Sequence, residues 1–123
     1  NKGIIMQPYI VDKMTDSDGV IIKKNAPEEW LTPTSSQLAD EISEMMVTVV
    51  REGTGSGAQL TGTQVAGKTG TAENSSGDSH AWFIGFAPAD NPQVAIAIIV
   101  ENAGSGGAVA APIAGRILAQ ALH

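Results

Sequence analysis

The sequence predicts an α+β fold, in which an antiparallel sheet is packed against helices. Three observations predict it. Residues 35–51 carry apolar side chains at helical spacing, and three stretches after residue 63 have the length and composition of strands. The last two stretches are joined only by residues 88–92, a connection too short to contain a crossover helix, so these two strands form an antiparallel hairpin.

The first part of the chain is predicted to form short strands. Tyr9–Met14 and Val20–Lys23 are strand candidates, and Thr15–Gly19 between them ends in Asp-Gly, a dipeptide typical of tight hairpin turns. Prolines at positions 8, 27 and 33 keep the strands of this region short.

Residues 35–51 are predicted to form a helix. Thr34 and Gln37 fit a capping box, in which the two side chains satisfy free amide groups at the start of a helix. Gly53 is a natural C-terminal stop. One face of the helix is apolar and is expected to lie in the core: Leu38, Ile42, Met45, Met46 and Val49.

The last part of the chain is predicted to contain three strands and a helix. The strands are Gln64–Ala72, His80–Ala87 and Gln93–Glu101. Val94–Val100 is continuously apolar, which is typical of a central strand covered on both faces. The final helix begins within residues 107–111, because Pro112 is tolerated only in its first turn.

Composition limits the possible functions. The chain has 123 residues, enough for one domain, and a net charge of −6, so it lacks the basic surface that nucleic-acid binding needs. It has no cysteine, which excludes a thiolate nucleophile and a disulfide framework. No apolar run approaches the ~20 residues that span a bilayer. Because the chain opens on Asn1 without a signal-like start, we expect it to be a piece of a longer polypeptide.

One candidate function is nucleotide binding. Residues Gly62–Thr69 match the phosphate-binding pattern G-x-x-x-x-G-K-[ST]. That pattern works where a glycine-rich loop leaves a buried strand and enters a helix, whose N-terminal amides hold the phosphates. Here Gly70 and the turn-forming residues 74–78 follow instead of a helix, so the structural context disfavours this interpretation.

A second candidate function is serine acyl transfer, based on Lys68-Thr69-Gly70-Thr71 in a predicted strand. A lysine ammonium beside an acylating serine favours loss of the serine proton. Threonine hydroxyls can bind a substrate carboxylate, and a backbone N–H of the strand can stabilise the tetrahedral oxyanion. Gly67 and Gly70 leave room for a peptide to lie against the strand.

Five stretches of the chain carry a resemblance to a known family: Gly53–Gly55, Val65–Glu73, His80–Pro88, Val94–Asn102 and Gly106–Ile113. Over nearly all of its length the sequence resembles the C-terminal portion, residues 1–123 here, of a single penicillin-binding protein transpeptidase domain of the class B monofunctional type. The resemblance implies part of the fold shared by penicillin-binding proteins and serine β-lactamases.

The resemblance also implies roles for individual residues. Lys68 is expected to join the proton-transfer network, and the Thr71 backbone N–H is expected to complete the oxyanion hole, so both are candidate catalytic residues. Thr69 and Thr71 are expected to bind the substrate carboxylate beside Gly70. Glu73 either lines the cleft or is simply solvated.

The chain departs from the family in one decisive respect. No lysine lies three positions after a serine, and no asparagine lies two positions after one, so Ser-x-x-Lys and Ser-x-Asn are both missing. We expect an upstream segment of the same polypeptide to supply both motifs, and we expect this chain alone to be inactive and to expose an apolar face where that segment docks.

The family implies further partners. Its members are anchored by an N-terminal membrane segment on the extracytoplasmic face of the bacterial cell membrane, so we expect membrane attachment only through such an anchor, outside residues 1–123. They cross-link peptidoglycan stem peptides during cell division or the maintenance of cell shape, and β-lactams acylate them. No metal or other cofactor is implied, and no nucleic-acid partner.

A third candidate function is a non-enzymatic module that binds a peptide along an exposed strand edge.

His80 could act as a general base at neutral pH. A histidine at the start of a strand without a partner is more often structural.

Overall fold

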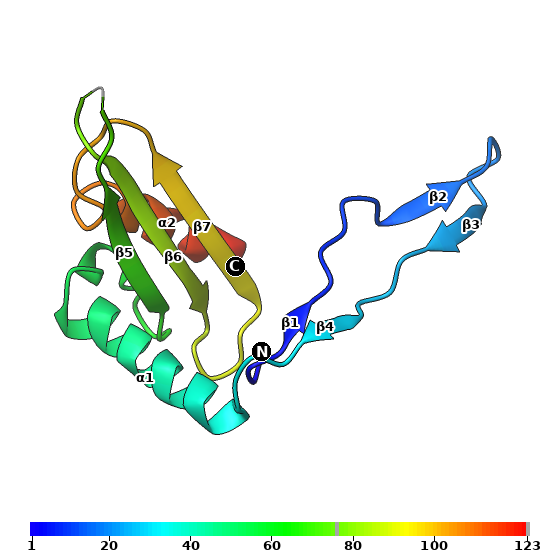
Figure 1. The fold of residues 1–123 in the computed structure, drawn as a ribbon, viewed down its shortest axis with the longest axis horizontal. Coiled ribbons are helices and arrows are strands. Elements are labelled where there is room, and N and C mark those ends of the chain that lie inside the picture. Colours follow the sequence, from blue (N-terminus) through cyan, green and yellow to red (C-terminus); the bar gives the residue numbers. More distant parts are fainter. Residues whose placement is uncertain (76, 123) are drawn as a thin grey trace. The chain divides into compact units, whose positions relative to one another are not determined.

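The computed structural model describes residues 1–75 and 77–122, and the chain divides into two compact units, Asn1–Asp40 and Glu41–His123. The strands and helices are labelled in Figure 1. No helix in the described part of the chain is both long enough and apolar enough to cross a membrane.

The first unit consists of two small antiparallel pairs of strands. β1 (Ile5–Met6) pairs with β4 (Glu29–Leu31), and β2 (Lys13–Thr15) pairs with β3 (Ile21–Lys24). Asp16 closes the β2–β3 turn, because its carboxylate accepts hydrogen bonds from the backbone N–H groups of Asp18 and Val20 at 3.0 and 2.8 Å. The predicted hairpin is therefore confirmed, although its first strand begins at Lys13 rather than Tyr9.

Helix α1 (Ser36–Glu52) begins in the first unit and continues into the second. Its predicted extent is right within one residue, but the predicted capping residue is wrong. The backbone N–H of Leu38 donates to Ser35 Oγ at 3.2 Å, so Ser35, and not Thr34, accepts the capping hydrogen bond. Thr34 and Ser35 are equally suitable by type, and the choice depends on where the first helical turn begins.

The second unit is built around a three-stranded antiparallel sheet with the order β5-β6-β7 (Figure 1). The strands are β5 (Ala66–Ala72), β6 (His80–Ala87) and β7 (Val94–Val100). Their register pairs Lys68 with Ile84 and Gly70 with Trp82 across β5 and β6. The sheet confirms the α+β prediction, including the β6–β7 hairpin.

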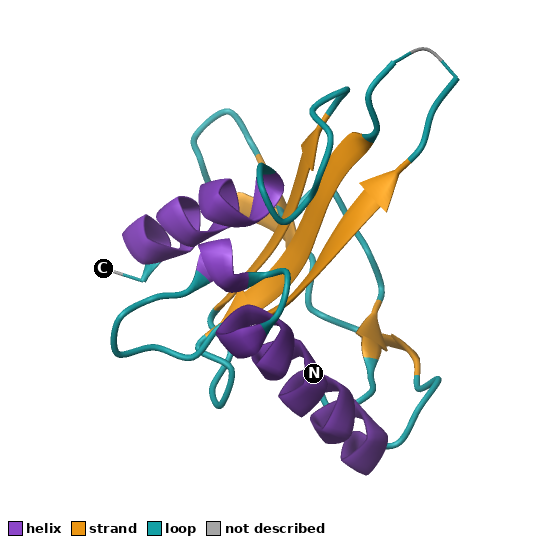
Figure 2. Ribbon diagram, turned by 90° about the vertical axis from the view of Figure 1, so that its left-hand side faces the viewer, coloured by secondary structure: helices purple, strands orange, loops and turns teal. Residues whose placement is uncertain are grey.

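Helix α2 (Ala110–Ala121) lies along one face of this sheet (Figure 2). It begins within the predicted range and holds Pro112 in its first turn. The buried side chains between α2 and the sheet include Phe83 and Leu118, both 0% exposed. A short 3₁₀ helix, η1 (Ser56–Ala58), contacts α2 and contributes the buried Ala58.

Two predictions about burial are wrong for this chain. β7 is an edge strand of the described sheet, and its alternate residues Ala95, Ala97 and Ile99 are exposed, so only one face of β7 is covered. The apolar stripe of α1 is also largely exposed: Met45 is 59% exposed, and only Val50, near the end of the helix, is buried. The apolar run of β7 and the apolar stripe of α1 are both typical of elements in a protein core. In this chain each leaves apolar surface exposed to solvent.

Candidate active site

Strand β5 lies at one end of the sheet order, so one of its edges is open in the described structure (Figure 1). This strand carries Lys68, Thr69, Gly70 and Thr71, the residues singled out in the sequence. Because side chains alternate along a strand, Lys68 points to one face of the sheet, and Thr69 and Thr71 point to the other. An open edge is the arrangement in which a ligand can reach both kinds of side chain and the backbone between them.

Lys68 stands on the face of the sheet that α2 does not cover. Its neighbours in register on this face are apolar and solvent-exposed: Trp82 is 37% exposed, Ile84 is 49% exposed and Ile99 is 46% exposed. The Lys68 ammonium group therefore lies next to an apolar surface that is exposed to solvent.

Thr69 and Thr71 stand on the opposite face, near the N-terminal side of α2. Thr69 pairs with the fully buried Phe83. Gly67, on the same face, has room for no side chain, because a Cβ there would lie 2.3 Å from Phe83 Cζ. Glycine at position 67 therefore makes room for Phe83, and the prediction that it leaves room for a peptide is wrong.

The backbone of β5 also presents groups to the open edge. Lys68 Nζ donates a hydrogen bond to the Thr69 carbonyl oxygen at 2.6 Å, which is consistent with a carbonyl directed away from β6. In an extended antiparallel strand a residue's N–H and C=O point the same way, and every second residue repeats that direction. The N–H groups of Thr69 and Thr71 therefore point to the open edge.

The Thr69 hydroxyl has a partner from outside the sheet. Thr54, in the connection between α1 and η1, places its Oγ1 2.7 Å from Thr69 Oγ1, and either hydroxyl can be the donor. The Thr71 hydroxyl accepts a hydrogen bond from the backbone N–H of Gly106 at 3.4 Å. Two loops, one after α1 and one before α2, therefore meet the two threonines of β5.

Glu73 and His80 lie near the end of β5 where the chain turns into β6. Glu73 is exposed and follows the last residue of β5. His80 is half-buried, and its Nδ1 accepts a hydrogen bond from the backbone N–H of Asn102 at 3.0 Å. The imidazole thus holds the connection after β7, which agrees with a structural role for His80.

The geometry is wrong for a phosphate-binding loop. Lys68 and Thr69 lie within β5, and the chain continues as strand through Ala72 before turning into β6. No helix N-terminus follows Thr69, so the backbone amides that would hold phosphate oxygens are absent from that position. Within residues 1–75 and 77–122, no group of three acidic or histidine side chains could hold a metal ion.

Sequence reasoning placed Lys68, Thr69, Gly70 and Thr71 correctly on one strand, but it gave no role to Thr54 or Gly106. Both belong to stretches that carry the family resemblance, Gly53–Gly55 and Gly106–Ile113. The contact between Thr54 and Thr69 depends on the path that the glycine-rich connection takes after α1. No local sequence pattern predicts that path.

The chain matches the family model for the penicillin binding protein transpeptidase domain over residues 1–119. It is 40% identical to the peptidoglycan D,D-transpeptidase PbpA of Mycolicibacterium smegmatis, covering 100% of this chain and 27% of that protein. It is 35% identical to stage V sporulation protein D of Bacillus subtilis, covering 99% of this chain and 21% of that protein. The chain therefore spans only about a quarter of the length of these relatives.

Solved structures give the same picture. Penicillin-binding protein A of Mycobacterium tuberculosis, as a ceftriaxone acyl-enzyme complex, matches with a TM-score of 0.91 and 38% identity, over 100% of this chain and 29% of that one. A D,D-transpeptidase domain of a peptidoglycan glycosyltransferase from Eggerthella lenta matches with a TM-score of 0.89 and 38% identity, over 99% of this chain and 28% of that one.

These matches in sequence and in fold confirm the resemblance to penicillin-binding protein transpeptidase domains from which the site residues were predicted. By its sequence and by its fold, this chain belongs to the penicillin-binding protein transpeptidase family.

Proposed function

We propose that this chain is the C-terminal portion of a serine D,D-transpeptidase domain and forms one wall of its active site. The complete enzyme cross-links peptidoglycan stem peptides that end in D-Ala-D-Ala, and β-lactams acylate it as mimics of that dipeptide. The chain acts together with an upstream segment of the same polypeptide that carries Ser-x-x-Lys and Ser-x-Asn. The names of the relatives, PbpA D,D-transpeptidases among them, support this proposal.

The observation that carries the proposal is the open edge of β5. It offers the Lys68 ammonium, the hydroxyls of Thr69 and Thr71, and outward-directed backbone N–H groups within one short strand. A peptide can lie along such an edge as an added strand. Gly70, between the two threonines, adds no side chain to the strand face on which Lys68 stands.

The residues of β5 suit the steps of acyl transfer. As the upstream serine oxygen attacks the carbonyl carbon of the penultimate D-Ala, the serine proton passes to the amine of the departing terminal D-Ala through a network that the Lys68 ammonium joins. The Thr71 N–H stabilises the oxyanion of the tetrahedral intermediate, and the hydroxyls of Thr69 and Thr71 bind the terminal carboxylate. Glu73 lines the cleft beyond Thr71. An acceptor amine then attacks the ester, forms the cross-link and releases the serine.

The apolar surface beside Lys68 is the proposed docking site of the upstream segment. Trp82, Ile84 and Ile99 form an exposed apolar patch on the uncovered face of the sheet. Contiguous exposed apolar surface of this kind marks an interface. A segment that covers this patch comes to lie next to Lys68, where the acylating serine is needed.

The location of the complete enzyme follows from its substrate. Peptidoglycan is assembled outside the cytoplasm, so we propose that the domain works on the extracytoplasmic face of the bacterial cell membrane, held there by an N-terminal anchor. The relationship to the peptidoglycan D,D-transpeptidase PbpA is consistent with a role in building cell wall.

A fluorescent penicillin tests this function. Three samples are compared: this chain alone, a complete protein in which the chain follows its upstream segment, and the complete protein with Lys68→Ala. We expect covalent label on an upstream serine of the complete unmodified protein, much slower labelling of the Lys68→Ala protein and no label on this chain alone. Stable label on the chain alone, or a complete protein that is not labelled, would contradict the proposal.

A non-enzymatic peptide-binding module is the second candidate, since an open strand edge is all that such a module needs. It requires the chain to fold and to bind a peptide without any upstream segment. Saturable binding of an extended peptide by the isolated chain would favour the module, because the transpeptidase proposal gives the isolated chain no such activity.

A further inference from the structure

The exposed Thr54 side chain contacts the hydroxyl of Thr69, which is one of the two proposed carboxylate-binding hydroxyls. Its Oγ1 lies 2.7 Å from Thr69 Oγ1, the distance of a good hydrogen bond between hydroxyls. Thr54 and Thr69 are separated by the whole connection from α1 to β5, so this contact is tertiary and is produced by the fold.

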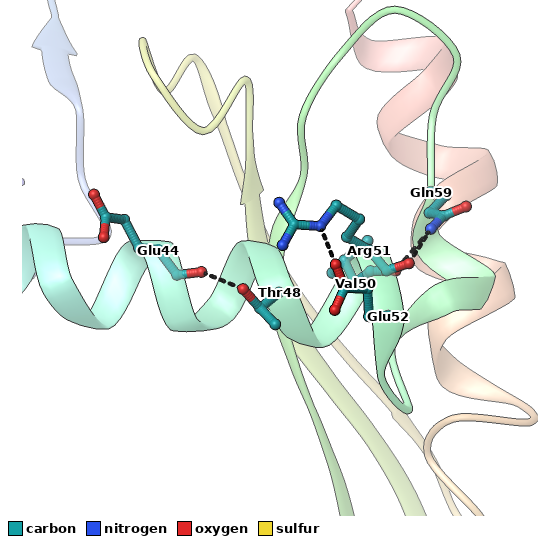
Figure 3. Close-up of polar contacts among 6 residues, drawn as sticks. All are labelled: Glu44, Thr48, Val50, Arg51, Glu52 and Gln59. Carbon is teal, nitrogen blue, oxygen red and sulfur yellow. Dashed lines mark hydrogen bonds and ion pairs between the residues drawn. The ribbon is translucent and has the colours of Figure 1, made fainter.

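Thr54 is held firmly in place at the end of α1. The backbone N–H groups of Gly53 and Gly55, on either side of it, both donate to the Val49 carbonyl at 3.0 Å. Gln59 closes the same end of the helix, because its Nε2 donates to the carbonyls of Val50 and Arg51 at 3.1 and 2.8 Å (Figure 3). These bonds satisfy carbonyls that a helix end leaves free.

A second contact fixes Thr54 from the other side. A Cβ on Gly107 would lie 2.5 Å from the Thr54 carbonyl oxygen, so the loop before α2 packs directly against this residue. Thr54 is thus anchored by the helix end and by the 105–107 loop, and its hydroxyl has a defined position relative to β5.

The number of protons on each hydroxyl determines whether Thr69 and Thr71 can donate a hydrogen bond to a ligand. Each threonine hydroxyl has one proton to donate and lone pairs to accept with. At Thr71 the partner is the Gly106 N–H, which can only donate, so the Thr71 proton remains available for a ligand. At Thr69 the same outcome requires Thr54 to be the donor.

A bound carboxylate selects that arrangement. It accepts hydrogen bonds and cannot donate them, so it favours the state in which Thr54 donates to Thr69 and Thr69 donates to the ligand. Hydrogen bonds in such a chain polarise and strengthen one another. Thr69 and Thr71 would then both donate a hydrogen bond to the ligand. Each would also accept one from a different loop, Thr69 from Thr54 and Thr71 from the Gly106 N–H.

We propose that Thr54 is a positioning residue that directs the Thr69 hydroxyl proton towards the carboxylate of the ligand. This inference rests on the proposed function, because it assumes a carboxylate-bearing substrate or β-lactam at the edge of β5. It predicts that Thr54 contributes to the preference for a ligand that carries a free carboxylate.

The test compares two probes on the complete protein: benzylpenicillin, which has a free carboxylate, and its methyl ester, which does not. Thr54→Val keeps the shape of the side chain and removes the hydroxyl. We expect the second-order acylation rate with benzylpenicillin to fall about three- to tenfold and the rate with the ester to change by less than about twofold. Thr54→Ser restores the hydroxyl and is expected to stay within about twofold of the unmodified protein.

Thr48→Val is the matched control, since it also removes a threonine hydroxyl from this part of the chain. That hydroxyl donates to the Glu44 carbonyl of its own helix at 3.1 Å (Figure 3). The control is expected to leave the ratio of the two acylation rates unchanged.

Three outcomes would overturn the inference. If Thr54→Val lowers both rates equally, Thr54 only supports the strand, and if it lowers neither, Thr54 has no part in the site. If Thr54→Ser behaves like Thr54→Val, the hydroxyl is not the active feature. A complete unmodified protein that reacts with neither probe overturns the proposed function itself, which separates the two kinds of failure.

Discussion

Gly106 lies directly against the backbone of Gly70 in strand β5. A Cβ on Gly106 would stand 2.2 Å from the Gly70 carbonyl oxygen and 2.3 Å from the Trp82 carbonyl oxygen. The loop before α2 can therefore approach the sheet this closely only with glycine at position 106. The same residue donates its N–H to Thr71 Oγ1, so the close approach also determines where the Thr71 hydroxyl lies.

Gly106→Ala is predicted to lift this loop from β5. The new methyl group meets two backbone oxygens that cannot move without disturbing the strand pairing, and overpacking of this kind costs about 1–3 kcal/mol of stability. In the complete protein we expect acylation by a fluorescent penicillin to slow about tenfold, since the Thr71 hydroxyl loses its backing donor. Gly77→Ala is the control, because among the described residues a Cβ there has only Asn102 Oδ1 within reach, at 4.0 Å. Equal acylation rates in the two variants would contradict this role for Gly106.

Lys68→Ala in the complete protein is predicted to lower the acylation rate about a hundredfold or more, as expected for loss of a group that takes part in proton transfer. The measurement is the rate of covalent labelling at saturating fluorescent penicillin. Lys23→Ala removes an exposed lysine from β3 and is the control. A Lys68→Ala variant with the rate of the control would show that the ammonium has no chemical role.

Lysine substitutions in the uncovered apolar patch (Trp82, Ile84 and Ile99) are predicted to lower the unfolding free energy of the complete protein much more than that of the isolated chain. Ile84→Lys and Ile99→Lys should change the unfolding free energy of the isolated chain by less than about 0.5 kcal/mol, because both side chains are exposed there. In the complete protein the same changes should cost about 2 kcal/mol or more, if the upstream segment buries these positions. Denaturant unfolding measures both.

Ile98→Lys provides the contrast for that experiment. Ile98 packs against the core on the α2 face of the sheet, so its replacement should destabilise the isolated chain and the complete protein alike. If Ile84→Lys destabilises the isolated chain as strongly as Ile98→Lys does, the patch is not a docking surface.

Gln59→Ala is predicted to loosen the end of α1 and, with it, Thr54. The change removes two hydrogen bonds to helix carbonyls, worth about 1 kcal/mol each (Figure 3). We expect a lower unfolding temperature together with part of the acylation defect of Thr54→Val. A Gln59→Ala variant that loses stability but keeps the full preference for a free carboxylate would show that Thr54 does not depend on this cap.

The sequence predicted well the features that local patterns determine. The ranges of α1, β6 and the hairpin of β6 with β7 follow from side-chain periodicity and from a short connection. Lys68 through Thr71 could be assigned to one strand in the same way. The pair β1–β4 was not predicted, because Ile5–Met6 is too short to show any alternation.

Burial and tertiary contacts could not be predicted in the same way. An apolar stripe such as the one containing Ile42 and Met45 indicates that a face will be covered, but it does not say whether the covering segment belongs to this chain. The contact of Thr54 with Thr69 depends on the path of a glycine-rich connection, and the approach of Gly106 to Gly70 depends on the packing of α2. These contacts arise only when the whole sheet has formed.

A crystal structure of the complete protein acylated by benzylpenicillin tests most directly whether the open edge of β5 holds the ligand. We predict the carboxylate within about 2.5–3.2 Å of the hydroxyls of Thr69 and Thr71, and the acyl carbonyl oxygen at a similar distance from the Thr71 N–H. An acyl group whose carboxylate and carbonyl oxygen both lie away from β5 would contradict the central claim.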